Sequence, residues 1–225
     1  MRERAVGLLL ALAALARPAL AQEMPGEQPP PAAFPTSFTA FVFLGSEGRR
    51  ATRVFIDPLV PGCDVNPCSS DQDLSGAPGL GARFQTSVAS RAAFRLGVAI
   101  GWTHYKIISA NGGSSFSPPD RVRLLRADGV LLFRLKPQVP VYFGLGAAIG
   151  EFSPGVVINQ PDVTEFGGVV VLGIDHRVSP KIGTRFEWTG YLMKPDLTNY
   201  PSEYHAPNLA LDMQFSFGLN FFVIR

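Results

Sequence analysis

The sequence predicts an all-β fold, an eight-stranded antiparallel up-and-down transmembrane β-barrel. The first observation lies in residues 207–225, where every second residue from Leu209 to Val223 is apolar and the alternate residues, except Phe222, are polar or small. A period of two is typical of a β-strand with one apolar face, and this strand exceeds the roughly 5–6 residues usual in soluble proteins. The second observation is that seven more stretches alternate similarly. Backbone groups cannot remain unpaired in lipid, so such strands must close into a ring.

The composition agrees with many turns and few long helices, because glycine (23) and proline (20) are both abundant among the 225 residues. That length suits one domain or at most two. The formal net charge of +2 is too small to indicate a nucleic-acid partner. Beyond the N-terminus, no apolar run in the sequence reaches the roughly 20 residues that a membrane helix requires.

The N-terminus, residues 1–21, is predicted to be a signal peptide. A basic start precedes an apolar stretch too short to span a membrane, and a small-x-small cleavage site ends at Ala21. We therefore expect the mature protein to be exported. Residues 22–35 are proline-rich without periodicity and are expected to form an extended periplasmic tail. The barrel domain is then assigned to 36–225.

The first three strands are expected at 36–45, about 79–89 and 92–106. Their even-numbered residues are mainly apolar, and their odd-numbered residues are mainly small, polar or charged, although Phe41 and Phe43 make the first strand less regular. This pattern predicts one lipid-facing side for each strand. The apolar positions are Phe38, Ala40, Val42, Leu44, Leu80, Ala82, Phe84, Val88, Phe94, Leu96, Val98, Ile100 and Trp102.

The fourth strand, 121–135, changes phase along its length. Val122 and Leu124 are apolar at even numbers, whereas Leu131, Phe133 and Leu135 are apolar at odd numbers. A β-bulge near 127–129 would produce this change and keep the number of strands at eight, so we favour it. The alternative is a hairpin that turns at Asp128-Gly129.

The last four strands are expected at 139–150, 165–177, 181–193 and 207–225. In the first of these, one face is apolar and the other is almost entirely glycine and alanine. In the third, the second face carries arginine and glutamate. Small residues relieve crowding inside a narrow barrel, where opposite charges can also pair.

The connections alternate in length along the chain. The long ones lie near 60, 113, 158 and 200, with the first a polar loop at about 46–77, and the short ones lie near 90, 137 and 179. An up-and-down barrel with short periplasmic turns and longer outer loops has this alternation.

Over about 36–225, this pattern resembles the small eight-stranded outer-membrane β-barrels of the OmpA and OmpX type. The resemblance implies the outer membrane of a Gram-negative-type bacterium, contact with outer-membrane lipid, and assembly by the outer-membrane insertion machinery. In that family the last strand usually ends in an aromatic residue that assists insertion. This chain has Phe221-Phe222 close to its end and then Val223-Ile224-Arg225.

A soluble eight-stranded barrel of the lipocalin type would also alternate, but with its apolar face inside. Here the bulky residues share one face and the charged ones the other, which favours the membrane barrel. We expect Arg185 to lie roughly opposite Asp175, and a network of charges to plug the lumen. Its expected members are Arg83, Arg95, Asp175, Arg185, Glu187 and Asp212. Aromatic residues near strand ends are expected at the membrane interfaces: Trp102, Tyr105, Trp188, Tyr191 and Phe221.

The two cysteines, Cys63 and Cys68, lie in the first outer loop of an exported protein and are expected to form a disulfide. Two thiols alone do not make a zinc site, so no metal and no cofactor are expected. His104 and His205 lie near outer strand ends, but the sequence has no G-x-S-x-G elbow for a nucleophile. We therefore do not expect an enzyme.

The sequence thus predicts a monomeric outer-membrane barrel with a structural or surface-interaction role, whose surface ligand it does not identify. A narrow porin-like channel for small solutes is the alternative, and a lipid-modifying outer-membrane enzyme is the third possibility.

Overall fold

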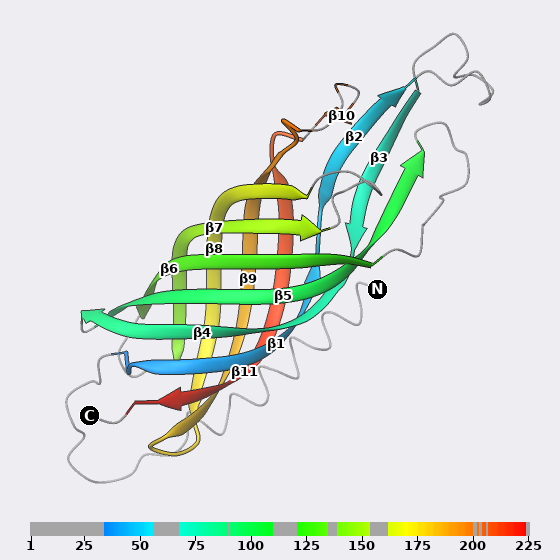
Figure 1. Ribbon diagram of the computed structural model, residues 1–225. Helices are drawn as coiled ribbons and strands as arrows, with labels where there is room; N and C mark the ends of the chain where they lie inside the picture. Colours follow the sequence, from blue (N-terminus) through cyan, green and yellow to red (C-terminus); the bar gives the residue numbers. More distant parts are fainter. Residues whose placement is uncertain are drawn as a thin grey trace. The chain divides into compact units, whose positions relative to one another are not determined.

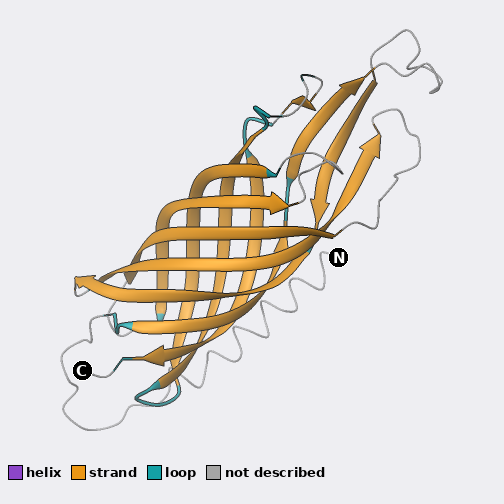
Figure 2. Ribbon diagram, in the orientation of Figure 1, coloured by secondary structure: helices purple, strands orange, loops and turns teal. Residues whose placement is uncertain are grey.

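Eleven β-strands form a single sheet in the described part of the chain (Figures 1 and 2). The computed structural model describes residues 34–55, 68–89, 91–109, 121–134, 139–153, 162–199, 202, 204–205 and 207–223, without the side chains of 49–55, 68–75, 104–109 and 121. The strands are β1 Ser37–Ser46, β2 Arg49–Phe55, β3 Cys68–Ser75, β4 Ala77–Ala89, β5 Ala92–Ser109, β6 Arg121–Arg134, β7 Val141–Ser153, β8 Val163–Arg177, β9 Ile182–Asp196, β10 Tyr204–His205 and β11 Ala210–Phe222.

Eight of these strands close into a ring in the order β1, β4, β5, β6, β7, β8, β9 and β11, and β11 pairs again with β1. Every neighbouring pair in the ring is antiparallel. The predicted all-β, eight-stranded antiparallel barrel is confirmed. We call the end with the connections β4–β5, β6–β7 and β8–β9 the turn end, and the opposite end the loop end.

The strands of the ring are staggered. Paired residues lead from Ser37 through Gln85 and Arg95 around the ring to Asp212. Met213 of β11 pairs with Ser46 of β1, so the neighbouring Asp212 lies opposite position 47 of the same chain. A circuit of the ring that starts at Ser37 therefore returns ten residues further along. Such a stagger tilts the strands relative to the barrel axis, and eight strands enclose a space just wide enough for side chains to fill.

The connection expected as a polar loop at 46–77 contains two strands, so that prediction is wrong. β2 and β3 form an antiparallel pair that extends β1 and β4 at the loop end, and β3 continues along the outer part of β5 (Figure 1). Gly76, at φ 37°, allows the bend between β3 and β4. The short strand β10 pairs with the other edge of β2. β3 has polar residues on both faces, so its sequence lacks the apolar alternation that would have predicted a strand.

β6 is a regular strand, and the favoured β-bulge near 127–129 is wrong, as is the alternative hairpin. Its pairing with β5 and β7 runs without a register shift. The change of phase arises because Val122 and Leu124 are buried inside the barrel, whereas Leu131 faces outward. Because apolar side chains occupy the inner face near the loop end, the sequence pattern there is the same as one produced by a change of face.

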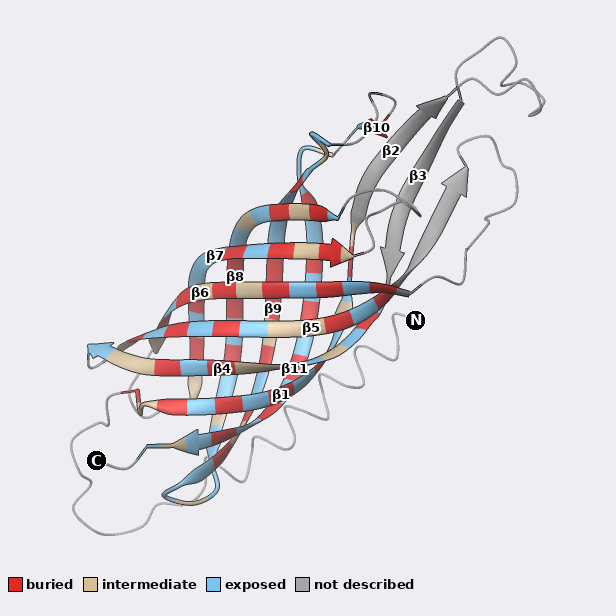
Figure 3. Ribbon diagram, viewed as in Figure 1, coloured by how far each residue is buried: buried red, intermediate tan, exposed pale blue. Residues whose placement is uncertain are grey.

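Burial alternates along each ring strand, as the bands of Figure 3 show. The outward residues are bulky and apolar, and many are half exposed or more, for example Leu44 (68%) and Phe215 (61%). An apolar belt of this extent would be unstable against water and is stable against lipid. The described residues include no helix that is both long and apolar enough to cross a membrane.

Candidate functional site

The lumen holds the buried charged residues. Four arginines, Arg83, Arg95, Arg126 and Arg185, are 0–2% exposed. They come from β4, β5, β6 and β9. An unpaired buried charge is very costly, so each requires acceptors inside the barrel. The described ion pairs between buried or largely buried side chains form three groups along the lumen, and one further pair, Arg123–Glu151, is exposed on the outside.

Glu187 of β9 is the centre of the middle group. Arg83 Nη2 lies 2.9 Å from Glu187 Oε1, and Arg95 Nη1 lies 2.6 Å from the same oxygen. The hydroxyl of Tyr142 donates to Glu187 Oε2 at 2.8 Å, and that of Thr189 donates to Oε1 at 3.0 Å. One carboxylate therefore links β4, β5, β7 and β9 across the lumen.

Arg95 also binds a second carboxylate. Its Nη2 lies 2.8 Å from Asp128 Oδ1 on the neighbouring strand β6. Asp128 in turn accepts a hydrogen bond of 3.4 Å from the hydroxyl of Tyr191. The sequence reasoning missed Asp128, because the Asp-Gly pair was interpreted as a bulge or a turn.

The group at the turn end is built on Asp175 and Arg185, which are direct cross-strand partners. Arg185 donates to both carboxylate oxygens of Asp175, at 2.7 and 3.1 Å. Gln85 accepts from Arg185 at 2.8 Å, and Asn220 donates to Asp175 at 3.1 Å. Arg134 lies 3.5 Å from the same aspartate. A bidentate arginine–carboxylate pair is geometrically specific as well as strong.

Reversing the charge in this group is expected to be costly. In Arg185→Glu, two carboxylates face each other, and we expect the free energy of unfolding to fall by about 3 kcal/mol. A second change, Asp175→Arg, restores opposite charges and recovers part of the loss. Urea titration in detergent micelles measures both effects, with the lipid-facing Ile174→Val as the matched control. Wild-type stability of Arg185→Glu would contradict the assignment.

The group at the loop end surrounds Arg126 of β6. Its Nη2 lies 2.7 Å from Asp212 and 3.2 Å from both Glu47 and Glu165. The guanidinium also stacks 4.2 Å from the ring centre of Tyr191. Of the six residues predicted for the lumen network, Asp212 alone lies in this group. Arg126 was missed because β6 was assigned a change of face at that point.

Apolar residues close the lumen at both ends. At the loop end, Val122, Leu124, Phe152 and Val163 belong to one buried cluster. At the turn end, Phe34 is 1% exposed and packs edge-on against Tyr142, with the Arg134 guanidinium 4.5 Å from its ring centre. An apolar cluster therefore closes the loop end of the lumen, and Phe34 covers the charged group at the turn end.

Glycines leave room for these side chains. A Cβ at Gly97 would lie 2.9 Å from both carboxylate oxygens of Asp128, and one at Gly173 would lie 2.2 Å from the Tyr142 hydroxyl. Each glycine therefore accommodates a bulky lumen side chain from an adjacent strand. The strand face of glycine and alanine that the sequence shows therefore makes space for the large polar residues of the lumen.

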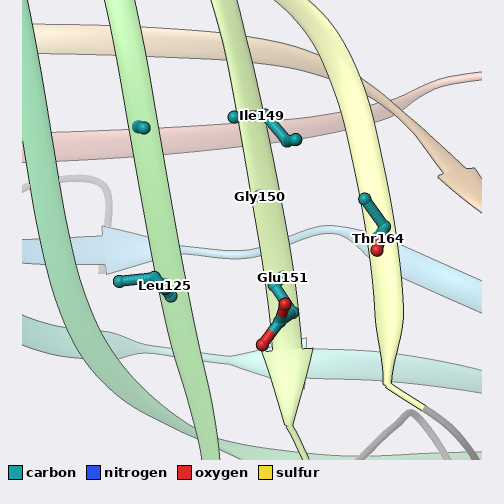
Figure 4. Close-up of a pocket in the computed structure, with 6 residues that line it drawn as sticks. Leu125, Ile149, Gly150, Glu151 and Thr164 are labelled. Carbon is teal, nitrogen blue, oxygen red and sulfur yellow. The ribbon is translucent and has the colours of Figure 1, made fainter.

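The hollow in Figure 4 lies on the outside of the wall. Outward residues including Leu125, Ile149 and Thr164 line it, across β6, β7 and β8. Its lining is mainly aliphatic and has one charged side chain, Glu151, which pairs with Arg123 at 3.8 Å. A lipid chain fits such a surface better than a polar substrate does.

The predicted interfacial aromatics have different positions. Trp102 and Phe221 are 40% and 44% exposed on the outward face. Trp188 lies midway along β9 and covers Gly190, where an added Cβ would lie 3.0 Å from the Trp188 ring. Tyr191 is 1% exposed inside the lumen, so its interfacial assignment is wrong, because odd-numbered residues of β9 face inward. The side chain of Tyr105 lies outside the described part.

The disulfide stays a prediction. Cys63 lies outside the described residues, and Cys68 begins β3 with its side chain not described. The same holds for the side chain of His104, while His205 is exposed in β10. Within the part of the chain that the structure describes, no three histidine, cysteine or acidic residues are grouped to hold a metal ion.

Comparisons with known proteins match the fold alone. No protein-family model matches the chain, and no curated protein is similar to it. The outer membrane protein OprG from Pseudomonas aeruginosa superimposes with a TM-score of 0.57 at 12% identity, over 86% of this chain and 98% of OprG. The outer membrane protein AlkL, solved in lipid bilayers, superimposes with a TM-score of 0.52 at 13% identity, over 91% and 97%. The chain therefore has the fold of the small eight-stranded outer-membrane β-barrels.

Proposed function

We propose that this protein is an outer-membrane barrel with a closed lumen and a structural or surface-interaction role. In this proposal residues 1–21 direct export, the turn end faces the periplasm and the loop end faces outward. Short periplasmic turns and longer outer connections are the rule for such barrels, and the connections of this chain follow it. The OprG and AlkL likenesses support the same membrane.

The filling of the lumen carries the proposal. The side chains of Arg83, Arg95 and Glu187 are 0–1% exposed at mid-height, where an aqueous channel would leave them in water. Eight strands enclose a space just wide enough for side chains. The apolar cluster at the loop end adds a second barrier, because aliphatic and aromatic side chains such as Val122, Leu124 and Phe152 offer no polar partner to a passing ion.

The extended sheet at the loop end supports the surface role. β2 and β3 and the last residues of β5 continue beyond the pairing of the ring, and β10 covers part of one edge of β2. β2 and β3 are largely polar in sequence, and they lie at the loop end, which we assign to the cell exterior. A surface ligand, if bound, would meet these strands first.

Conductance in a planar lipid bilayer tests the closed lumen. We expect the wild-type protein to give no steady ion current, because the ion-pair groups and the apolar cluster fill the lumen. A general porin in the same bilayer is the positive control. Insertion is checked on the same sample by faster gel migration without boiling.

Two outcomes would overturn the proposal in different directions. A steady current from inserted protein would favour the narrow channel for small solutes. Release of acyl chains from outer-membrane lipid by the purified protein would favour the lipid-modifying enzyme.

A further inference from the structure

Basic side chains gather at the turn end of the barrel. Arg91 lies in the connection between β4 and β5, and Arg177 and Lys181 flank the turn between β8 and β9; all three are exposed. We call these three residues the basic collar. They lie in or next to two different connections at the same barrel end, so together they form a charged rim.

Acidic residues avoid this end. Among the described residues of the turn end, at 34–37, 86–94, 131–144, 173–184 and 219–223, Asp175 is the one acidic side chain. It is bound by Arg185 at 2.7 Å inside the lumen and is therefore not available to neutralise the collar. The exposed acidic residues Asp162 and Asp196, by contrast, lie at the loop end. The charge of the two ends is therefore asymmetric.

The turn that carries Arg177 and Lys181 is ordered. The Arg177 guanidinium donates to the backbone carbonyls of Ser179 and Pro180 at 3.2 and 2.7 Å, and it lies 5.0 Å from the ring centre of Phe222. The Ser179 hydroxyl accepts from the backbone N–H groups of Lys181 and Ile182. Arg177 is thus held at the rim while its side chain stays exposed.

Apolar side chains are interleaved with the collar. Val178 is 64% exposed and Ile182 is 42% exposed, on either side of Lys181. Phe221 and Val223, near the end of β11, are 44% and 56% exposed at the same end. A surface that alternates cations with exposed aliphatic and aromatic groups fits the boundary between acyl chains and headgroups. A free phosphate ion or a hydrophilic polymer would make no favourable contact with these apolar residues.

We propose that the basic collar binds the phosphate headgroups of anionic phospholipids in the leaflet at the turn end. This inference rests on the proposed membrane barrel, because the collar must lie at the membrane surface. It goes beyond that function in naming a lipid class and a leaflet. Basic residues beside an apolar segment attract anionic lipid by their charge, and this attraction falls with ionic strength.

Lipid selectivity measured by electron spin resonance tests the proposal. The mature protein is folded in phosphatidylcholine vesicles that contain trace spin-labelled phosphatidylglycerol or phosphatidylcholine. We expect phosphatidylglycerol to be preferred about threefold or more at the protein surface. In the triple variant Arg91→Gln, Arg177→Gln, Lys181→Gln, the two labelled lipids should associate about equally with the protein.

The matched control removes exposed cations from the opposite half of the barrel, with Arg123→Gln and Lys194→Gln, and should keep the preference. Lys181→Gln alone, which should lower the preference partly, serves if the triple variant does not fold. Inorganic phosphate added at constant ionic strength should leave the preference unchanged; its loss would assign the collar to free phosphate instead. Equal association of both labelled lipids with folded wild-type protein, or binding of purified peptidoglycan through the collar, would overturn the proposal. Heat-modifiable migration and absent conductance in the same samples show separately whether the proposed barrel function holds.

Discussion

Deleting residues 207–225 is expected to abolish membrane insertion. β11 pairs with β1 from Met213 to Phe222 and with β9 from Ala210 to Phe221, so its loss leaves two open strand edges in lipid. Each unpaired backbone group in hydrocarbon costs several kcal/mol. The lumen also loses Asp212, Ser216 and Asn220, which bind Arg126, Arg83 and Asp175.

Heat-modifiable migration and protease resistance in vesicles measure this result. The truncated chain should show neither a fast-migrating band nor a protected fragment. Phe215→Leu with Phe217→Leu is the control, because it changes two outward residues of β11 and keeps both ladders. A truncated protein that inserts and resists protease would show that the ring does not need this strand.

Replacing Glu187 is expected to have the largest effect of any single substitution in the lumen. In Glu187→Leu, Arg83 loses its described ion pair and Arg95 keeps only Asp128. Removing one partner of a buried ion pair costs about 3–5 kcal/mol, because the remaining charge is left without compensation. We expect the free energy of unfolding in a urea titration to fall by that amount.

A double variant separates charge from packing. Adding Arg83→Leu to Glu187→Leu removes the charge that was left unpaired, and a buried pair replaced by apolar groups is often neutral in stability. The double variant should therefore recover much of the free energy of unfolding that Glu187→Leu loses. Phe186→Leu, one residue away on the lipid side, is the control and should change stability little. If the double variant is less stable than Glu187→Leu, packing and not charge explains the effect.

The sequence predicts most of the ring, because lipid imposes one simple rule on the outward face. Side chains that face hydrocarbon must be apolar, so β4 and β11 show their period of two directly. The same rule is enough to assign Arg83, Arg95 and Arg185 to the inward face, because each alternates with apolar neighbours along its strand.

The inward face follows no such rule, and here prediction failed. Val122 and Leu124 pack inside at the loop end, and they are chemically like lipid-facing residues. β6 was therefore assigned a bulge, and Arg126 and Asp128 were lost from the predicted site. Tyr191 failed for a related reason: an aromatic residue suits a membrane interface and also the lumen, where its ring faces Arg126. Cross-lumen partners such as Arg95 and Glu187 depend on the stagger of the closed ring, which no single strand reveals.

The pairing of every ring strand on both of its edges limits how this chain can change in length. Inserting or deleting one residue within a ring strand would turn all side chains beyond that point to the opposite face. An open sheet can absorb such a change at its edge, but here each ring strand is paired on both sides. The altered strand would bring Arg126 or Glu187 toward lipid and an apolar residue into the lumen. Variation in length among related chains should therefore be confined to the connections, most of all those at the loop end.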